Sequence, residues 1–189
     1  MQSQILTEFV KGSPKLRFNQ GDILKDISFF IGTGEDLHLL EINLKYAIVI
    51  SQECDLEHDY NTRAMESQLN QDKFLPNVLV LPAYLSDNFR QGKHRGEDIK
   101  GEEWKSTEKW NVIQRNNNPR FHTIKESQEF QIPNLVLDFK HLYSIDREEI
   151  YRKKEKIYLA SICELYRELI SQRYSNYLGR IGLPDKTTI

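Results

Sequence analysis

The stretch KYAIVIS, residues 45–51, is the strongest candidate for a buried strand in the chain. A continuous apolar run rich in β-branched residues is typical of a strand that is covered on both faces. A second run, VLVLP at 78–82, has the same character but ends in a proline. Because proline cannot donate to a sheet ladder, we expect that strand to end at the margin of the sheet. We therefore expect Ile48 and Val80 to be buried.

Two pairs of shorter strands are predicted on either side of these runs. Residues 23–30 and 37–42 flank the turn signal at 32–34 and predict a hairpin. Residues 120–125 and 130–137 predict a second hairpin, which follows the turn-rich sequence NNNP. The front of the chain is therefore expected to be mainly β.

The last part of the chain has helical signals. Asp146 is expected to cap a short helical turn, and residues 157–160 form a brief candidate strand. Ser161 and Glu164 match a capping box, and an apolar face continues from there to Gly179. We expect a helix over this last stretch.

The fold class expected is mainly β with α: an SH3-like small β-barrel with long loop insertions and a C-terminal helix. The barrel is assigned to residues 1–146, with insertions at 52–77 and 86–118. A helix is expected at 61–71, and the second insertion is expected to be a mobile surface loop. Residues 147–189 are expected to be a helical tail packed on the barrel.

Composition narrows the class of protein. The 189 residues carry a formal net charge of −2, which argues against a protein that coats nucleic acid by bulk charge alone. Two cysteines provide no disulfide framework, and no apolar run approaches the roughly 18 residues of a membrane span. We therefore expect a cytoplasmic protein with no membrane contact.

The order of the motifs resembles the MazF/PemK family of small SH3-like barrels. The similar segments are Gly21-Asp22-Ile23, residues 45–51, Val80-Leu81-Pro82 and residues 136–146. The resemblance implies a barrel of about five strands with a C-terminal helix. In active family members it also implies a metal-independent ribonuclease that serves as a toxin.

Two positions depart from the family pattern. Lys45 stands where the family has an arginine that stabilises charge on the scissile phosphate, and lysine cannot grip phosphate bidentately. The family's hydroxyl residue after its Val-Pro strand is replaced by Ala83-Tyr84-Leu85. Our first hypothesis is therefore a binding or regulatory module in a nucleic-acid, toxin–antitoxin or defence context. The alternative is an endoribonuclease in which Lys45 and Arg120 neutralise phosphate while His122 or His58 moves protons.

The string SQECDLEHD, residues 51–59, carries a further enzyme hypothesis. Cys54 and His58 would face each other on a helix, so the histidine could activate the thiol beside Asp55. His122 is a second candidate base for this hydrolase. A buried, unreactive Cys54 is the stronger interpretation. Because the sequence has neither CxxC nor HExxH spacing, we expect no metal site and no cofactor.

The segment from 89 to 122 mixes basic and aromatic side chains. Basic groups suit phosphates and aromatic planes suit unpaired bases, so the expected partner is single-stranded RNA or DNA. The candidate contacts are Arg90, Lys93, Arg95, Trp104, Trp110 and Arg115. A protein partner and a homodimer through the tyrosine-rich last helix are further expectations.

Overall fold

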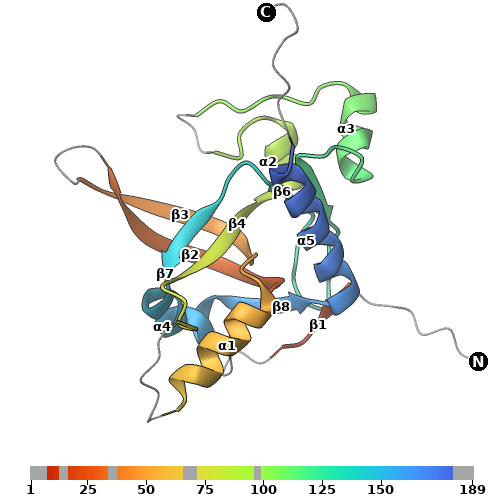
Figure 1. Ribbon diagram of the computed structural model, residues 1–189. Coiled ribbons are helices and arrows are strands. Elements are labelled where there is room, and N and C mark those ends of the chain that lie inside the picture. Colours follow the sequence, from red (N-terminus) through yellow and green to blue (C-terminus); the bar gives the residue numbers. More distant parts are fainter. Residues whose placement is uncertain (1–7, 13–16, 34–37, 66–71, 96–98, 181–189) are drawn as a thin grey trace, which may run out of the picture.

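The computed structural model describes residues 8–12, 17–33, 38–65, 72–95 and 99–180. One antiparallel sheet curls strongly into a half-barrel, with helices around it (Figure 1). The strands follow the order β1-β8-β2-β3-β4-β6-β5, and β7 pairs with β4. The elements are β1 (Phe9–Val10), β2 (Asp22–Thr33), β3 (His38–Val49), α1 (Glu53–Arg63), β4 (Asn77–Leu85), α2 (Ser86–Arg90), α3 (Thr107–Gln114), β5 (Phe121–Ile124), β6 (Leu135–Asp138), β7 (Tyr143–Asp146), α4 (Arg147–Ile157), β8 (Tyr158–Ile162) and α5 (Glu164–Leu178).

The first predicted hairpin is confirmed, but its second strand is longer than expected. The stretches 37–42 and 46–50 were expected as separate strands, and β3 instead continues from His38 to Val49. Leu44 is buried opposite Ile27, while its neighbours Asn43 and Lys45 are exposed. The alternation of buried and exposed residues therefore continues through the polar residues. The turn expected at 32–34 lies partly outside the described residues.

β4 changes partners along its length. One edge pairs with β3, while the other pairs with β7 over residues 77–80 and then with β6 over residues 83–85. Pro82 lies at this change, opposite Ala47, so the prediction that it ends the strand is wrong. A residue without an N–H is tolerated there because β4 is between two partners on that edge.

The core lies on both faces of the curled sheet. Ile48 and Val80 are buried as predicted, and they belong to the two main apolar clusters. A third cluster joins Phe89 of α2, Trp110 of α3 and Phe121 of β5. This third cluster holds the second insertion against the sheet.

Both insertions differ from the prediction. The helix expected at 61–71 is α1, which begins earlier, at Glu53; residues 66–71 lie outside the described residues. Asp59 of α1 is buried and accepts hydrogen bonds from Arg63, Arg147 and the Leu75 N–H, which fixes the helix in this position. The second insertion contains α2 and α3, so the interpretation of 86–118 as a loop is wrong.

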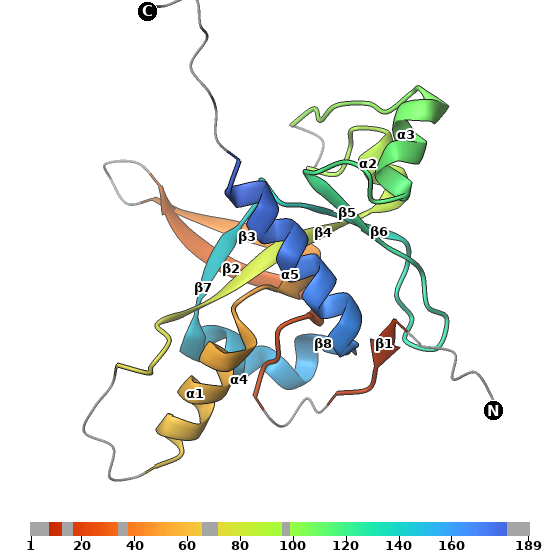
Figure 2. The same ribbon diagram turned by 45° about the vertical axis from the view of Figure 1, so that its right-hand side comes forward.

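The C-terminal part contributes a strand as well as helices. Asp146 caps α4 by accepting from the Glu149 N–H at 2.9 Å, as expected, although α4 is longer than a single turn. β8 lies within the sheet between β1 and β2, and α5 follows it along the sheet (Figure 2). The residues after 146 are therefore part of the same sheet and not only a helical tail.

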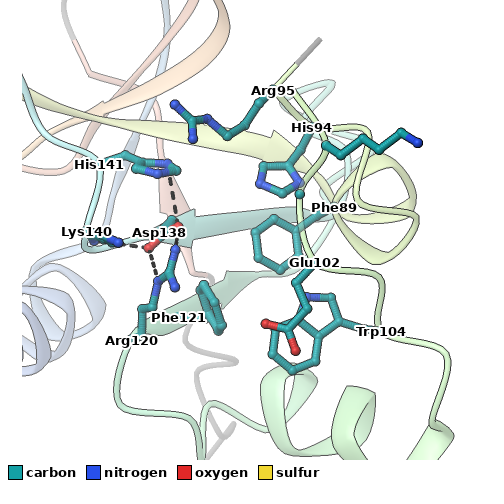
Figure 3. A pocket seen from close by; sticks show the side chains of 12 residues that line it. Phe89, His94, Arg95, Glu102, Trp104, Arg120, Phe121, Asp138, Lys140 and His141 are labelled. Carbon is teal, nitrogen blue, oxygen red and sulfur yellow. Dashed lines mark hydrogen bonds and ion pairs between the residues drawn. The ribbon is translucent and has the colours of Figure 1, made fainter. Parts of the chain in front are cut away.

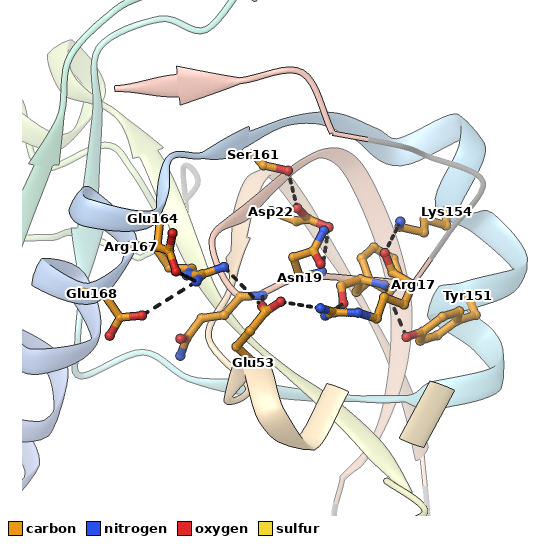
Figure 4. A network of polar contacts seen from close by, with 12 residues as sticks. Arg17, Asn19, Asp22, Glu53, Tyr151, Lys154, Ser161, Glu164, Arg167 and Glu168 are labelled. Atoms are coloured by element: carbon orange, nitrogen blue, oxygen red, sulfur yellow. Dashed lines mark hydrogen bonds and ion pairs between the residues drawn. The ribbon is translucent and has the colours of Figure 1, made fainter. Parts of the chain in front are cut away.

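A buried polar network replaces the capping box expected at Ser161 (Figure 4). Ser161 lies in β8, and its hydroxyl donates to Asp22 at 2.5 Å, so the N-cap of α5 is Cys163. Burial raises the pKa of Asp22. Nearby, the Lys154 ammonium donates to the Arg17 carbonyl at 2.6 Å. These contacts fasten the segment before β2 to α4 and β8.

No helix within the described ranges combines the length and the apolar character needed to cross a bilayer.

Two leucine substitutions test the position of the core. Leu81 of β4 is fully buried and Leu39 of β3 is 73% exposed. Leu81→Ala should lower the free energy of unfolding by about 2–5 kcal/mol, because a cavity remains in the core. Leu39→Ala should change it by less than about 0.5 kcal/mol. Urea unfolding followed by circular dichroism measures both, and equal losses would contradict the assigned sheet faces.

Candidate functional site

A cavity of about 150 Å³ lies where β5 and β6 meet the segment that follows α2 (Figure 3). Its walls combine permanent charges, histidines and aromatic rings. They are formed by Phe89, His94, Arg95, Lys100, Gly101, Glu102, Trp104, Arg120, Phe121, Asp138, Lys140 and His141. Charged, histidine and aromatic side chains therefore meet in this one small cavity.

A charge pair fixes one wall of the cavity. The Arg120 Nε and Nη2 donate to the two carboxylate oxygens of Asp138 at 2.7 and 2.6 Å. Asp138 also accepts from the Lys140 backbone N–H at 3.0 Å, and its side chain is buried at the end of β6. This hydrogen bonding raises the pKa of Arg120. The guanidinium is therefore held in one orientation, with its Nη1 group not engaged by Asp138.

Two histidines approach the same tyrosine. The Tyr84 hydroxyl and His141 Nδ1 are 2.9 Å apart, and the rings of Tyr84 and His94 have centroids 4.7 Å apart. Burial lowers the pKa of His94 to about 4 and lowers that of His141. Burial also raises the pKa of Tyr84. All three side chains are therefore uncharged at neutral pH.

The His94 ring has an unsatisfied atom. Its Nδ1 is buried and has no hydrogen-bond partner among the described residues. A buried polar atom without a partner is costly, and such atoms are uncommon in folded proteins. His94 therefore retains hydrogen-bonding capacity at the cavity wall.

The rim of the cavity is positively charged. Arg95, Lys100 and Lys140 line it and form no salt bridge with any described residue. Glu102 is the only carboxylate among the lining residues apart from Asp138, which Arg120 neutralises. The cavity therefore favours an anion. Within the described residues, no cluster of histidine, cysteine and carboxylate side chains could hold a metal ion.

Of the predicted catalytic residues, Arg120 alone lines this cavity. His122 is next to Phe121 on β5, so its side chain lies on the opposite face of the strand. There it is buried against Phe139. The proposal that His122 moves protons together with Arg120 is therefore wrong for this arrangement.

Lys45 lies in a neighbouring hollow. Its ammonium is exposed and pairs with Asp26 at 2.6 Å. The hollow has a volume of about 150 Å³ and shares His94 with the candidate site, and Tyr84 also lines it. Lys45 is therefore close to the site without lining it.

Cys54, Asp55 and His58 lie elsewhere, on α1. Cys54 and Asp55 line a groove of about 820 Å³ that extends to α5. Cys54 is exposed, which contradicts the interpretation of a buried cysteine. Its sulfur contacts Gln52 and Asp55 at 3.7 Å, and the described structure records no contact with His58. His58 is therefore not in place to activate the Cys54 thiol, and the other candidate base, His122, is buried on β5.

The predicted nucleic-acid contacts separate into three groups. Arg95 and Trp104 line the candidate site, and Trp104 also lines an adjacent hollow with Arg90 and Lys93. Trp110 is only 4% exposed in the third core cluster, so its expected role as a stacking surface is wrong. Arg115 is exposed at the end of α3 and lines neither hollow.

Seven residues with polar side chains at or beside the cavity were not predicted as site residues: Tyr84, His94, Lys100, Glu102, Asp138, Lys140 and His141. A signal existed for Asp138, because a carboxylate that ends the apolar run at 135–137 is costly to bury without a cationic partner. The two histidines carry no pattern of their own. Only folding brings them to Tyr84.

Comparison of the chain with protein-family models, with curated proteins and with solved structures finds no match in any of the three. The chemistry of the site is therefore the basis for a functional proposal.

The buried His122 predicts a stability change with pH. Burial, and then the charge of Arg173, lower its pKa to about 4. As pH falls from about 6.5 to 4, the unfolded chain binds a proton at this position and the folded chain does not, so stability is lost. His122→Phe should reduce that loss by up to about 3 kcal/mol. Urea unfolding at pH 7 and pH 4 measures the difference, and equal losses in both proteins would contradict it.

Proposed function

We propose that the chain is a small-barrel module that binds single-stranded RNA or DNA through the cavity between β5, β6 and the segment after α2. One observation carries this proposal: a guanidinium locked by a buried carboxylate shares a small cavity with Trp104 and with three cations that form no salt bridge with the described residues (Figure 3). The cations suit a phosphate and the aromatic ring suits an unpaired base.

The size of the cavity supports a phosphate as the group that enters it. Its volume of about 150 Å³ is well below the roughly 300–1,000 Å³ of pockets for drug-sized ligands. Arg120 is already oriented by Asp138, so less side-chain entropy is lost when an anion binds. Lys100 and Lys140 add positive charge, and a lysine ammonium does not require the fixed bidentate geometry that a guanidinium does.

Trp104 supports the nucleic-acid part of the proposal. Phe89 and Phe121 are buried and complete the core, whereas Trp104 is half-buried. Its ring packs edge-on against Phe121, with centroids 5.6 Å apart at 82°. We propose that the exposed part of the indole stacks on a base, and base–aromatic stacking tolerates different sequences.

The type of barrel, the cellular location, the biological context and the protein partners are part of the same proposal. The curled antiparallel sheet and the C-terminal α5 support an SH3-like barrel of the MazF/PemK type. A cytoplasmic role in a toxin–antitoxin or defence context, with a protein partner or a second copy of the chain, follows from that resemblance. Lys45, in its separate hollow and paired with Asp26, favours binding over the family's catalysis.

Charge substitutions test the proposed binding. Lys140→Ala and Arg95→Ala should each weaken binding of a fluorescent single strand and reduce the slope of log affinity against log salt by about one. Glu102→Gln should strengthen binding, because it removes a negative charge from the cavity. Fluorescence anisotropy over a salt series measures these effects. Lys156→Ala is the matched control, since that exposed lysine lies on α4, away from the cavity.

If the wild-type protein fails to bind any single strand at low salt, the proposal is wrong. Equal losses for Lys140→Ala and Lys156→Ala would show that binding depends on overall charge and not on this cavity.

A second candidate function is metal-independent cleavage of RNA. His94 and His141, both with lowered pKa, line the cavity that holds Arg120, and the rings of both contact Tyr84. A neutral histidine could accept the proton of a ribose 2′-hydroxyl, which attacks the adjacent phosphorus. The bond to the 5′-oxygen then breaks, and that oxygen takes a proton from the Tyr84 hydroxyl, which burial keeps protonated. Arg120 would stabilise the charge on the phosphate.

Cleavage should yield a 2′,3′-cyclic phosphate and a 5′-hydroxyl, and it should continue in EDTA. His94→Ala and His141→Ala should each lower its rate by about 10²–10⁴-fold, whereas His58→Ala on α1 should leave it unchanged. Gel analysis of labelled RNA measures the rate, with an all-deoxy strand as control. Intact RNA after prolonged incubation, or cleavage of the deoxy strand, would exclude this mechanism.

A further inference from the structure

Trp104 separates two hollows. One is the cavity of about 150 Å³ that contains Arg120, and the other has a volume of about 470 Å³ and lies beside α2. The second hollow is lined by Asp87, Arg90, Gln91, Lys93, Glu103, Trp104 and Lys105. Because Trp104 is part of both walls, a ligand that occupies both hollows would contact it.

The backbone holds Trp104 in place. Its N–H donates to the Arg90 carbonyl at 2.9 Å, so the segment after residue 99 is bound to the end of α2. The Gly101 N–H donates to the Gly92 carbonyl at 2.8 Å. Gly92 has a φ of 71°, and a Cβ there would lie 2.6 Å from the Gly101 oxygen. Only glycine fits this close approach, which fixes the tryptophan before a ligand arrives.

The two hollows differ in charge. In the second one, Arg90, Lys93 and Lys105 face Asp87 and Glu103, and Lys105 already pairs with Glu103 at 2.9 Å. Arg90 lies over the Trp110 ring at 5.7 Å, which leaves its charge available at the surface. The first cavity therefore has the stronger preference for a phosphate, while the larger second hollow has room for a sugar and a base.

We propose that the two hollows form one track for consecutive nucleotides of a single strand. This inference rests on the function proposed above and adds the length of the strand that the site binds. A phosphate occupies the cavity beside Arg120, the adjoining base stacks on Trp104, and the next nucleotide lies between Arg90 and Lys93. The ligand is thus an oligonucleotide of at least two nucleotides. Inorganic phosphate and a mononucleotide fill only part of the track, and a duplex hides the base faces that Trp104 needs.

Tryptophan fluorescence gives a direct test, because the chain contains only two tryptophans, Trp104 and Trp110. Trp110→Phe leaves Trp104 as the only fluorophore, and a stacked base should quench it. Uridine oligomers of one, two, four and eight nucleotides are the probes, with inorganic phosphate as a further arm and deoxythymidine oligomers to compare the two sugars. Trp104→Phe is the mirror control, in which the remaining fluorescence of the buried Trp110 should not change.

The length dependence of binding can be measured on the wild-type chain. Anisotropy competition should show affinity rising at least tenfold from the mononucleotide to the tetranucleotide.

Substitutions then test the individual contacts. Trp104→Ala should weaken tetranucleotide binding by roughly 5- to 150-fold, the range expected for the loss of one stacked base. Arg90→Ala and Lys93→Ala together should weaken the tetranucleotide and leave the mononucleotide unaffected.

The outcomes separate the two proposals. If mononucleotide and tetranucleotide bind equally well, or if Trp104 is not quenched, the track is wrong while phosphate binding at Arg120 stands. If a duplex binds as tightly as the single strand, the track is also wrong. If no oligonucleotide binds to the wild-type chain, both the proposed function and the track fail.

Discussion

The change of partner along β4 is the constraint on which the rest of the structure depends. One edge of this strand remains beside β3, but the other leaves β7 near Val80 and joins β6 from Ala83 onward. The sheet must curl to allow this exchange, and Pro82 lies at the change, where one hydrogen-bond donor fewer is tolerated. The exchange brings β5 and β6 beneath α2 and α3, because α2 begins directly after β4. Without it, the walls of the cavity would belong to separate parts of the molecule.

The electrostatics of the site follow from this geometry. Asp138 ends β6 in a buried position, where an unpaired carboxylate would be costly. Arg120 precedes β5, the hairpin partner of β6, and so reaches both oxygens of that carboxylate. The pair holds the guanidinium in one orientation, and the surrounding cations give the cavity a positive charge that favours an anion. Neutral His94 and His141 add hydrogen bonding without adding charge.

Local patterns predicted the strands well and the site poorly. The apolar run at 45–51 and the second run at 78–82 gave the positions of β3 and β4, because burial on both faces leaves a direct signal in the sequence. The glycines and charges of residues 86–118 gave an incorrect prediction, since Phe89, Trp110 and Ile113 form a core that only folding assembles. Arg120 was predicted because its charge suits a phosphate, and Trp104 because it is an aromatic residue within a segment rich in basic residues. His94 and His141 are distant in the sequence and meet at Tyr84 only through tertiary contacts, which no local pattern encodes.

Ultraviolet cross-linking to a single-stranded oligonucleotide, followed by mass spectrometry of the protein peptides, tests the central claim most directly. It reports which residues lie against the bases without any substitution. Cross-links are expected at Trp104 and in neighbouring peptides of the segments 89–104 and 120–141. Cross-links confined to α4, or to the groove between α1 and α5, would contradict the assignment of the site.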